Sequence, residues 1–159
     1  MKENYLEAVS LIERLHRLFL EVIKYELEGL KIADINNVQA LVLYNLGNEQ
    51  ISIGELTARG CYLGSNVSYN LQKMISNGYI DHAVSKHDKR SCVIKLSAKG
   101  AAFRKKLDAV LDRHVATLKT SDSGDVANLI ATLKNLEQFW GSATSHRTRF
   151  SGSSKKFLR

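Results

Sequence analysis

The residues that could do chemistry cluster between positions 65 and 91, and they are polar and basic. Residues 85–91 include four Lys, Arg or His side chains. Just upstream, apolar residues recur at helical spacing and predict a helix with one buried face: Val67, Leu71, Met74 and Ile75. Its other face presents hydrogen-bonding side chains: Ser65, Asn66, Tyr69, Gln72 and Lys73. A polar helix face beside a basic loop suits contact with a polyanion, although charge alone leaves a merely solvated surface as the alternative.

One compact unit must position those side chains. Ser52 and Glu55 have the spacing of a capping box, which predicts that a short helix begins there. Asn77–Gly78 is a typical end for the second helix. Residues 79–84 and 93–96 read as two antiparallel strands joined by the basic segment. Two short helices followed by such a hairpin form the pattern of a winged helix-turn-helix.

Longer helices flank this unit. The patterns predict one helix over about residues 5–30 and, after a cap at Ser97, two more within about residues 98–141. A further short helix is expected to start at Asn36 or Asn37. We therefore predict a mostly α fold with a small β-wing, in which the winged helix-turn-helix, about residues 36–100, is inserted between long amino- and carboxyl-terminal helices.

The terminal helices carry broad apolar surfaces. The first has two neighbouring stripes: Leu11, Ile12, Leu15, Leu18, Phe19, Val22, Ile23 and Tyr25. The last has a similar set: Val126, Leu129, Ile130, Leu133, Leu136 and Trp140. One neighbouring helix cannot cover so much apolar surface, so we expect part of it to meet a second subunit. Burial inside a monomeric core is the alternative.

Length and composition indicate one globular domain. The chain has 159 residues, of which 44% are hydrophobic and 25% charged, and a net charge of +7. We place the domain at residues 1–143 and a flexible basic tail at residues 144–159. This tail contains five Lys or Arg residues and no Asp or Glu. No stretch approaches the roughly 20 apolar residues of a membrane span, and the acidic amino terminus is unlike a signal peptide. We expect a cytoplasmic protein with no membrane partner.

Histidine and cysteine spacing gives no catalytic or metal-binding motif. The five histidines are far apart and accompany no phosphate loop or nucleophile elbow: His16, His82, His87, His114 and His146. We therefore expect no enzyme, no cofactor and no metal. The two cysteines, Cys61 and Cys92, are too few for a disulfide framework. Cys61 precedes a predicted helix and lies near Arg59, which favours a reactive thiolate, so a thiol redox sensor is an alternative function.

The segment from residue 88 to 100 carries a family signature. Its sequence, Asp-Lys-Arg-Ser-Cys-Val-Ile-Lys-Leu-Ser-Ala-Lys-Gly, resembles the wing of the MarR family, the multiple antibiotic resistance regulators: Asp-x-Arg, an aliphatic strand, then Leu-(Thr/Ser)-x-x-Gly. Residues 55–59 and 67–74 are similar to that family's paired helices, and residues 77–80 to its turn into the wing. Residues 38–43 are similar to the helix that precedes them.

The resemblance implies a homodimeric transcription regulator; a repressor is one candidate, and the sequence leaves an activator as the alternative. In that family the terminal helices of both subunits interdigitate and set two winged units on successive major grooves of a pseudo-palindromic site in double-stranded DNA. The resemblance also implies control by a small aromatic or carboxylic effector, bound between the dimerisation helices and the winged unit. Phe19, Tyr25 and Tyr44 are the candidates to line that site, and a place in the core is the alternative for each.

We assign DNA contacts on this basis. Contacts to bases and phosphates go to the second helix: Ser65, Asn66, Ser68, Tyr69 and Lys73. Contacts to the DNA backbone and minor groove go to the basic loop: Lys86, Lys89 and Arg90. Asp88 is expected to orient Arg90. Leu63 stands where that family often has a capping Ser or Thr, so Ser65 is an alternative cap and the helix start stays open. Contact with RNA or protein alone is the alternative for the whole unit.

Overall fold

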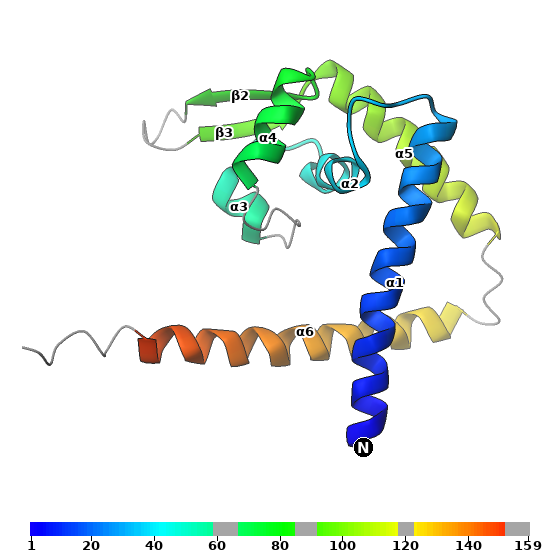
Figure 1. Ribbon diagram of the computed structural model, residues 1–159, viewed down its shortest axis with the longest axis vertical. Coiled ribbons are helices and arrows are strands. Elements are labelled where there is room, and N and C mark those ends of the chain that lie inside the picture. Colours follow the sequence, from blue (N-terminus) through cyan, green and yellow to red (C-terminus); the bar gives the residue numbers. More distant parts are fainter. Residues whose placement is uncertain (59–66, 85–91, 118–122, 152–159) are drawn as a thin grey trace, which may run out of the picture. The chain divides into compact units, whose positions relative to one another are not determined.

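The computed structural model describes residues 1–58, 67–84, 92–117 and 123–151 (Figure 1). The helices are α1 (Lys2–Gly29), α2 (Asn37–Leu46), α3 (Ile53–Ala58), α4 (Val67–Ser76), α5 (Ala98–Thr117) and α6 (Ser123–Ser151). The strands are β1 (Ile51–Ser52), β2 (Ile80–Val84) and β3 (Cys92–Leu96). The chain forms two compact units, Met1–His114 and Val115–Arg159, which we describe separately. The predicted fold class is confirmed: a mostly α protein with a small antiparallel sheet, flanked in sequence by long helices.

The sheet has three strands rather than the two that the sequence predicted. Its order is β1-β3-β2, and both pairings are antiparallel. β2 and β3 pair from Ile80 opposite Leu96 to Val84 opposite Cys92, so residues 85–91 connect the two strands of a hairpin, as expected. β1 adds Ile51 opposite Ile94. A strand of two residues is too short to show an alternating pattern, so the sequence did not predict β1.

Three predicted helix starts are confirmed by side-chain caps. At α3, the backbone N–H of Ser52 donates to the Glu55 carboxylate (2.6 Å), and the Glu55 N–H donates to Ser52 Oγ (3.1 Å). At α2, Asn36 is the cap. At α5, the Gly100 N–H donates to Ser97 Oγ (3.1 Å). Each cap satisfies backbone donors that a helix start leaves without partners.

The core of the first unit is built around α2. This helix packs on α1 and on β3. The largest completely buried side chains come from α1, α2, α3, α4, β3 and α5: Ile23, Val42, Leu43, Leu46, Leu56, Met74, Ile94, Leu107 and Val110. Burying these side chains is the main force that holds the unit together. The core therefore joins the predicted winged helix-turn-helix to the carboxyl-terminal half of α1 and to α5.

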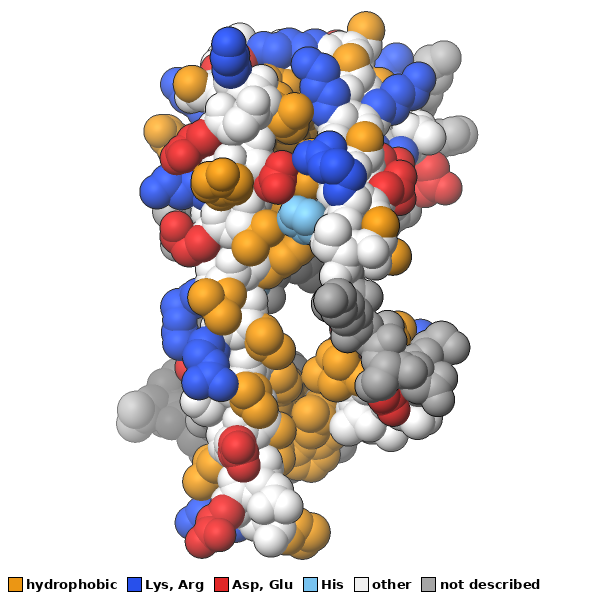
Figure 2. Space-filling view, turned by 90° about the vertical axis from the view of Figure 1, so that its right-hand side faces the viewer, with side chains coloured by type: hydrophobic (Ala, Val, Ile, Leu, Met, Phe, Trp, Pro, Cys, Tyr) orange, Lys and Arg blue, Asp and Glu red, His pale blue; other side chains and the backbone are white. Residues whose placement is uncertain are grey.

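The apolar stripes of the terminal helices remain largely exposed. On α1, only Ile23 and Leu27 are buried, whereas Leu15 is 58% exposed. Figure 2 shows apolar side chains open to solvent along α1, the helix that rises from the bottom of the view. On α6, Leu129 is 57% exposed. Part of each stripe is therefore exposed.

The last helix is longer than predicted. α6 continues to Ser151, past the domain end that we placed at residue 143. The backbone of residues 144–151 is thus helical, residues 152–159 lie outside the described chain, and the flexible basic tail at residues 144–159 stays a prediction. The sequence between residues 142 and 151 contains no Gly or Pro, the residues with the lowest helix propensity. Within the described chain, no helix combines the length and apolar character of a membrane span.

Candidate nucleic-acid interface

Helix α4 has the two faces that its spacing predicted. Leu71 and Met74 are buried in the core. On the opposite side, Tyr69 is 69% exposed, and Ser68, Gln72 and Lys73 are also exposed. This side of α4 therefore presents an aromatic hydroxyl, a small hydroxyl, an amide and an ammonium group to solvent, which together can contact base edges and phosphates.

The carboxyl end of α4 is closed by Gly78, as predicted. The Gly78 N–H donates to the Ile75 carbonyl (2.9 Å), and the Tyr79 N–H donates to the Met74 carbonyl (2.9 Å). Gly78 has a φ of 77°, a left-handed conformation that glycine adopts at no steric cost. This pair of bonds is a Schellman motif, which stops the helix and turns the chain directly into β2.

A polar cluster on the far side of that turn joins three segments of the chain. Asp34, between α1 and α2, accepts from the Tyr79 hydroxyl (2.7 Å) and from Lys99 Nζ (2.7 Å). The Asn77 side-chain amide donates to the Asp34 backbone carbonyl. Lys99 also donates to the Asn77 carbonyl (2.8 Å), and its Nζ lies 4.1 Å from the centre of the Tyr79 ring. The end of α4 is thus tied both to the α1–α2 connection and to the start of α5.

The charges in this cluster shift two pKa values in opposite directions. Burial acts to raise the pKa of Asp34, but hydrogen bonds from Lys99 and Tyr79 outweigh it, so that this pKa lies below its usual value. Burial, and then the hydrogen bond to Asp34, raise the pKa of Tyr79. Both shifts keep Asp34 charged and Tyr79 neutral at neutral pH. The cluster therefore stays intact under ordinary conditions.

A second polar contact reaches the middle of α4. Gln39 is 3% exposed and is the buried polar residue among those the structure describes. Its Nε2 donates to Asn70 Oδ1 on α4 (3.1 Å), while its Oε1 accepts from the Asn36 N–H (3.1 Å). An unpaired buried amide is unfavourable, so this geometry is the one that leaves Gln39 satisfied.

Gly100 lets the start of α5 approach the start of β2. A Cβ built on Gly100 would overlap the Tyr79 carbonyl oxygen and lie 3.1 Å from Leu96 Cδ2. Next to it, the Tyr79 and Phe103 rings meet edge to face with their centres 5.8 Å apart. The final Gly of the wing signature thus has a packing reason: α5 can sit against the turn that ends α4 only without a side chain here.

Comparisons with known proteins agree with this geometry. Residues 35–100 match the family model described as a winged helix DNA-binding domain. Over 146 residues, 90% of this chain and 75% of the relative, the sequence is 38% identical to the exopolysaccharide II synthesis transcriptional activator ExpG of Rhizobium meliloti. The chain belongs to the MarR family of winged-helix transcription regulators. It is accordingly a regulator with a DNA-binding domain of this type, and not an enzyme.

Solved MarR-type structures share the fold. A mutant MarR from E. coli complexed with operator DNA matches with a TM-score of 0.68 and 24% identity, covering 84% of this chain and 95% of that one. FabT of Streptococcus pneumoniae in complex with DNA matches with a TM-score of 0.64 and 19% identity, covering 87% and 99%. A MarR protein from Peptoclostridium difficile matches with a TM-score of 0.70 and 20% identity, covering 86% of this chain and 91% of that one.

The predicted DNA-contacting residues of this MarR-family chain fall into two groups. Ser68, Tyr69 and Lys73 are described, and all three lie on the exposed side of α4. The others lie outside the described residues: Ser65, Asn66, Lys86, Asp88, Lys89 and Arg90, together with the redox candidate Cys61. Their DNA contacts remain predictions. Sequence analysis missed the contacts that Asp34, Gln39, Asn70 and Asn77 make, because Gln39 and Asn70 are 31 residues apart and Asp34 and Asn77 are 43 residues apart.

The three effector candidates do not gather in one place. Tyr25 is 74% exposed on α1, so the alternative of a core position is wrong for it. Phe19 is also exposed on α1. Tyr44 lies on α2, where its hydroxyl donates to Asp108 Oδ1 (3.0 Å). This hydrogen bond raises the pKa of Tyr44. The Arg104 guanidinium lies 5.7 Å from the centre of the Tyr44 ring.

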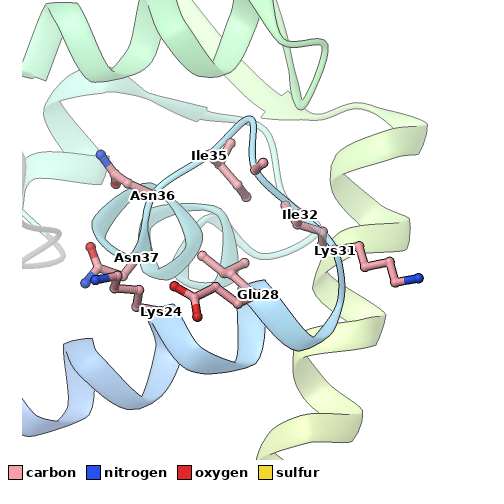
Figure 3. Close-up of a pocket in the computed structure, with 9 residues that line it drawn as sticks. Lys24, Glu28, Lys31, Ile32, Ile35, Asn36 and Asn37 are labelled. Carbon is pink, nitrogen blue, oxygen red and sulfur yellow. The ribbon is translucent and has the colours of Figure 1, made fainter.

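A cavity of about 620 Å³ lies where α1 leads into α2 (Figure 3). Its walls are formed by Lys24, Leu27, Glu28, Lys31, Ile32, Ala33, Ile35, Asn36 and Asn37, and by none of the three effector candidates. Figure 3 shows the Lys31 side chain extending away from the other lining residues. Lys24 and Glu28 bring opposite charges to the wall, so the cavity selects neither anions nor cations. Among the described residues, no group of three His, Cys, Asp or Glu side chains is arranged to bind a metal ion.

Proposed function

We propose that this MarR-family protein is a homodimer that reads a pseudo-palindromic operator in double-stranded DNA and releases it when a small carboxylic effector binds. In each subunit, α4 enters a major groove and residues 85–91 lie along the adjacent backbone and minor groove. The observation that carries the proposal is the exposed polar side of α4, which is held on a packed core while Tyr69 and Lys73 face outward. MarR of E. coli and FabT, whose folds it shares, have been solved with DNA.

The exposed apolar stripes support the homodimer. Leu11, Leu15, Leu18 and Val22 lie on one side of α1 and are each at least 36% exposed. Monomeric soluble proteins rarely leave such contiguous apolar surface open to water. A second copy of the chain, with the same stripes, provides a self-complementary cover. Two winged units in one particle then match two half-sites of an operator.

Arg104 supports a carboxylic effector near Tyr44. Within the described residues, the buried Nε of Arg104 has no hydrogen-bond acceptor, although its Nη1 donates to Asn48 Oδ1 (2.9 Å). A carboxylate is the natural acceptor for a free guanidinium donor, and the Tyr44 ring offers an apolar face for an aromatic body. Benzoate titrated into the protein–operator complex is expected to release DNA, and Arg104→Gln is expected to abolish that release.

Two substitutions test the DNA-binding assignment. The operator is first selected from a random duplex library. Tyr69→Ala is expected to erode discrimination between operator and scrambled DNA while leaving scrambled-DNA affinity nearly intact. Arg90→Ala is expected to weaken binding to every duplex by about 1 to 3 kcal/mol per subunit and to reduce the salt slope by about one ion. Wild-type affinity and selectivity in both variants, as folded dimers, would show that DNA binds another surface.

A promoter fusion measures the direction of regulation. The selected site is placed within a reporter promoter, and transcription is compared with and without the protein. Lower transcription in its presence would identify a repressor. Higher transcription would instead give this protein the output named for its R. meliloti relative, an activator.

A further inference from the structure

Helix α4 is held along one edge by side-chain amides. Asn70 accepts from Gln39 Nε2 (3.1 Å), and Asn77, just after the last helical residue, donates to the Asp34 backbone carbonyl. Asn70 and Asn77 are seven positions apart, about two helical turns, and so lie on the same side of the helix axis. Both partners come from one short segment, residues 34–39, which leads from α1 into α2.

The opposite edge of α4 is packed more loosely. A cavity of about 450 Å³ lies there between α4 and the hairpin strands. The α4 side chains that line it are Ser68, Leu71, Gln72, Ile75 and Ser76, and Ile53, His82, Cys92 and Ile94 complete the wall. Because of this cavity, side chains on that edge have room to move. The apolar contacts that remain there do not fix an angle, since the hydrophobic effect is not directional. The hydrogen bonds of the first edge are directional and fix an angle.

We propose that Gln39 and Asp34 are positioning residues that set the rotation of α4 about its own axis, and thereby decide which of its side chains meet the DNA bases. The inference rests on the proposed function, in which α4 reads DNA. Rolling α4 toward the cavity breaks the bond between Gln39 and Asn70 and leaves a buried amide unpaired. The native rotation is thus the arrangement that satisfies the amide contacts of the segment 34–39.

The segment that holds α4 is itself fixed. Asn36 caps α2 through Gln39, since the Asn36 side chain accepts from the Gln39 N–H (2.8 Å). The Asn37 side-chain amide donates to the Leu20 carbonyl of α1 (2.9 Å). Lys99 and Tyr79 hold the Asp34 carboxylate from the other side. The segment 34–39 therefore fixes the rotation of α4 relative to α1. We assign the exposed stripe of α1 to the dimer contact.

The test compares selectivity with stability. Gln39→Leu replaces the amide with an apolar side chain of similar size. The ratio of scrambled-DNA Kd to operator Kd is expected to fall about tenfold, while scrambled-DNA Kd stays within about twofold of wild type. Val110→Ala, a completely buried position on α5 outside the segment, is the matched control. It is expected to lower the melting temperature and keep the selectivity ratio.

A conservative variant separates hydrogen bonding from packing. Asn70→Asp keeps an acceptor for Gln39 Nε2, and its added charge repels both duplexes alike, so the selectivity ratio is expected to stay near wild type. Asn70→Leu removes the acceptor and is expected to behave like Gln39→Leu. Equal selectivity in Gln39→Leu and wild type, or an equal loss in Val110→Ala, would overturn the inference.

Tyr69→Ala, measured in the same assay, separates this inference from the proposed function. If Tyr69→Ala loses selectivity and Gln39→Leu does not, α4 reads DNA and the amide contacts do not set its rotation. If Tyr69→Ala keeps full selectivity, the assignment of α4 as the reading helix fails first, and the inference falls with it.

Discussion

The burial of apolar side chains differs between two regions of the molecule. One is the winged helix-turn-helix, residues 35–100, and the other is the pair of terminal helices, α1 and α6. Among the described residues of 35–100, the large apolar side chains other than Tyr69 are buried or half-buried, and polar groups such as Gln39, Asn70 and Ser97 have partners in the same chain. The terminal helices instead expose rows of leucine. The difference teaches that residues 35–100 bury their apolar side chains within one chain, whereas the terminal helices leave apolar surface that the proposed dimer would cover.

Removing α6 should break this contrast most severely. A chain that ends before Val126 loses one of the two apolar stripes and is expected to be a poorly soluble monomer. Because two coupled half-sites can raise affinity by about 10²- to 10⁴-fold over one, operator affinity should fall by a comparable factor. Sedimentation measures the oligomeric state, and fluorescence anisotropy measures the affinity. A soluble dimer with wild-type operator affinity would contradict the role of the stripe.

Gly100→Ala should disrupt the complete unit. The added methyl group meets the carbonyl oxygen of Tyr79, the residue just before β2, and moving this oxygen would disturb the hydrogen bond that it accepts from the Ser97 N–H (3.0 Å). The expected loss in the free energy of unfolding is about 2 to 3 kcal/mol, measured by urea denaturation.

Gly54→Ala is the matched control for that substitution. In α3 the nearest atom to a new Cβ is Ser52 Oγ at 3.8 Å, which is ordinary contact. Replacing a helical Gly by Ala should therefore stabilise the protein by about 0.5 to 1 kcal/mol. Equal effects of both substitutions would refute the close approach at Gly100.

Asp34→Asn should have a smaller, pH-dependent effect. The pKa of Asp34 is lower in the folded protein than the ordinary pKa of an aspartate, so its charge stabilises the fold above that ordinary value. The stabilisation is lost as pH falls through the lower, folded-state pKa. In thermal melts at pH 7, the melting temperature of wild type should be higher than that of Asp34→Asn. This difference in melting temperature should shrink steadily below about pH 4. A difference that is independent of pH would show that the carboxylate charge is not what holds Lys99 and Tyr79.

Lys31→Gly should have the smallest effect, and a favourable one. Lys31 ends α1 with a φ of 57°, and its N–H donates to the Glu28 carbonyl (3.0 Å). A residue with a Cβ is disfavoured in this left-handed conformation, whereas glycine is not. The melting temperature should therefore rise, by a few degrees for about 1 kcal/mol. Unchanged or lower stability would show that Lys31 makes compensating contacts.

Local contacts were predictable from the sequence. Ser52 with Glu55, and Ser97 with the N–H of Gly100, are pairs three residues apart, so the chain needs no distant partner to form them. Gly78 stops α4 through its own backbone freedom. The apolar spacing on α4 placed Leu71 and Met74 in the core and Tyr69 outside. These features follow from helix geometry alone, which fixes which residues share a face.

Tertiary structure alone decided the rest. β1 exists because Ile51 meets Ile94, and Gln39 is satisfied because Asn70 lies beside it. Asp34, Asn77 and Lys99 meet only when α1, α4 and α5 have packed. Pairings between residues distant in sequence have no local signature, because closing the chain between them depends on the burial of the whole core.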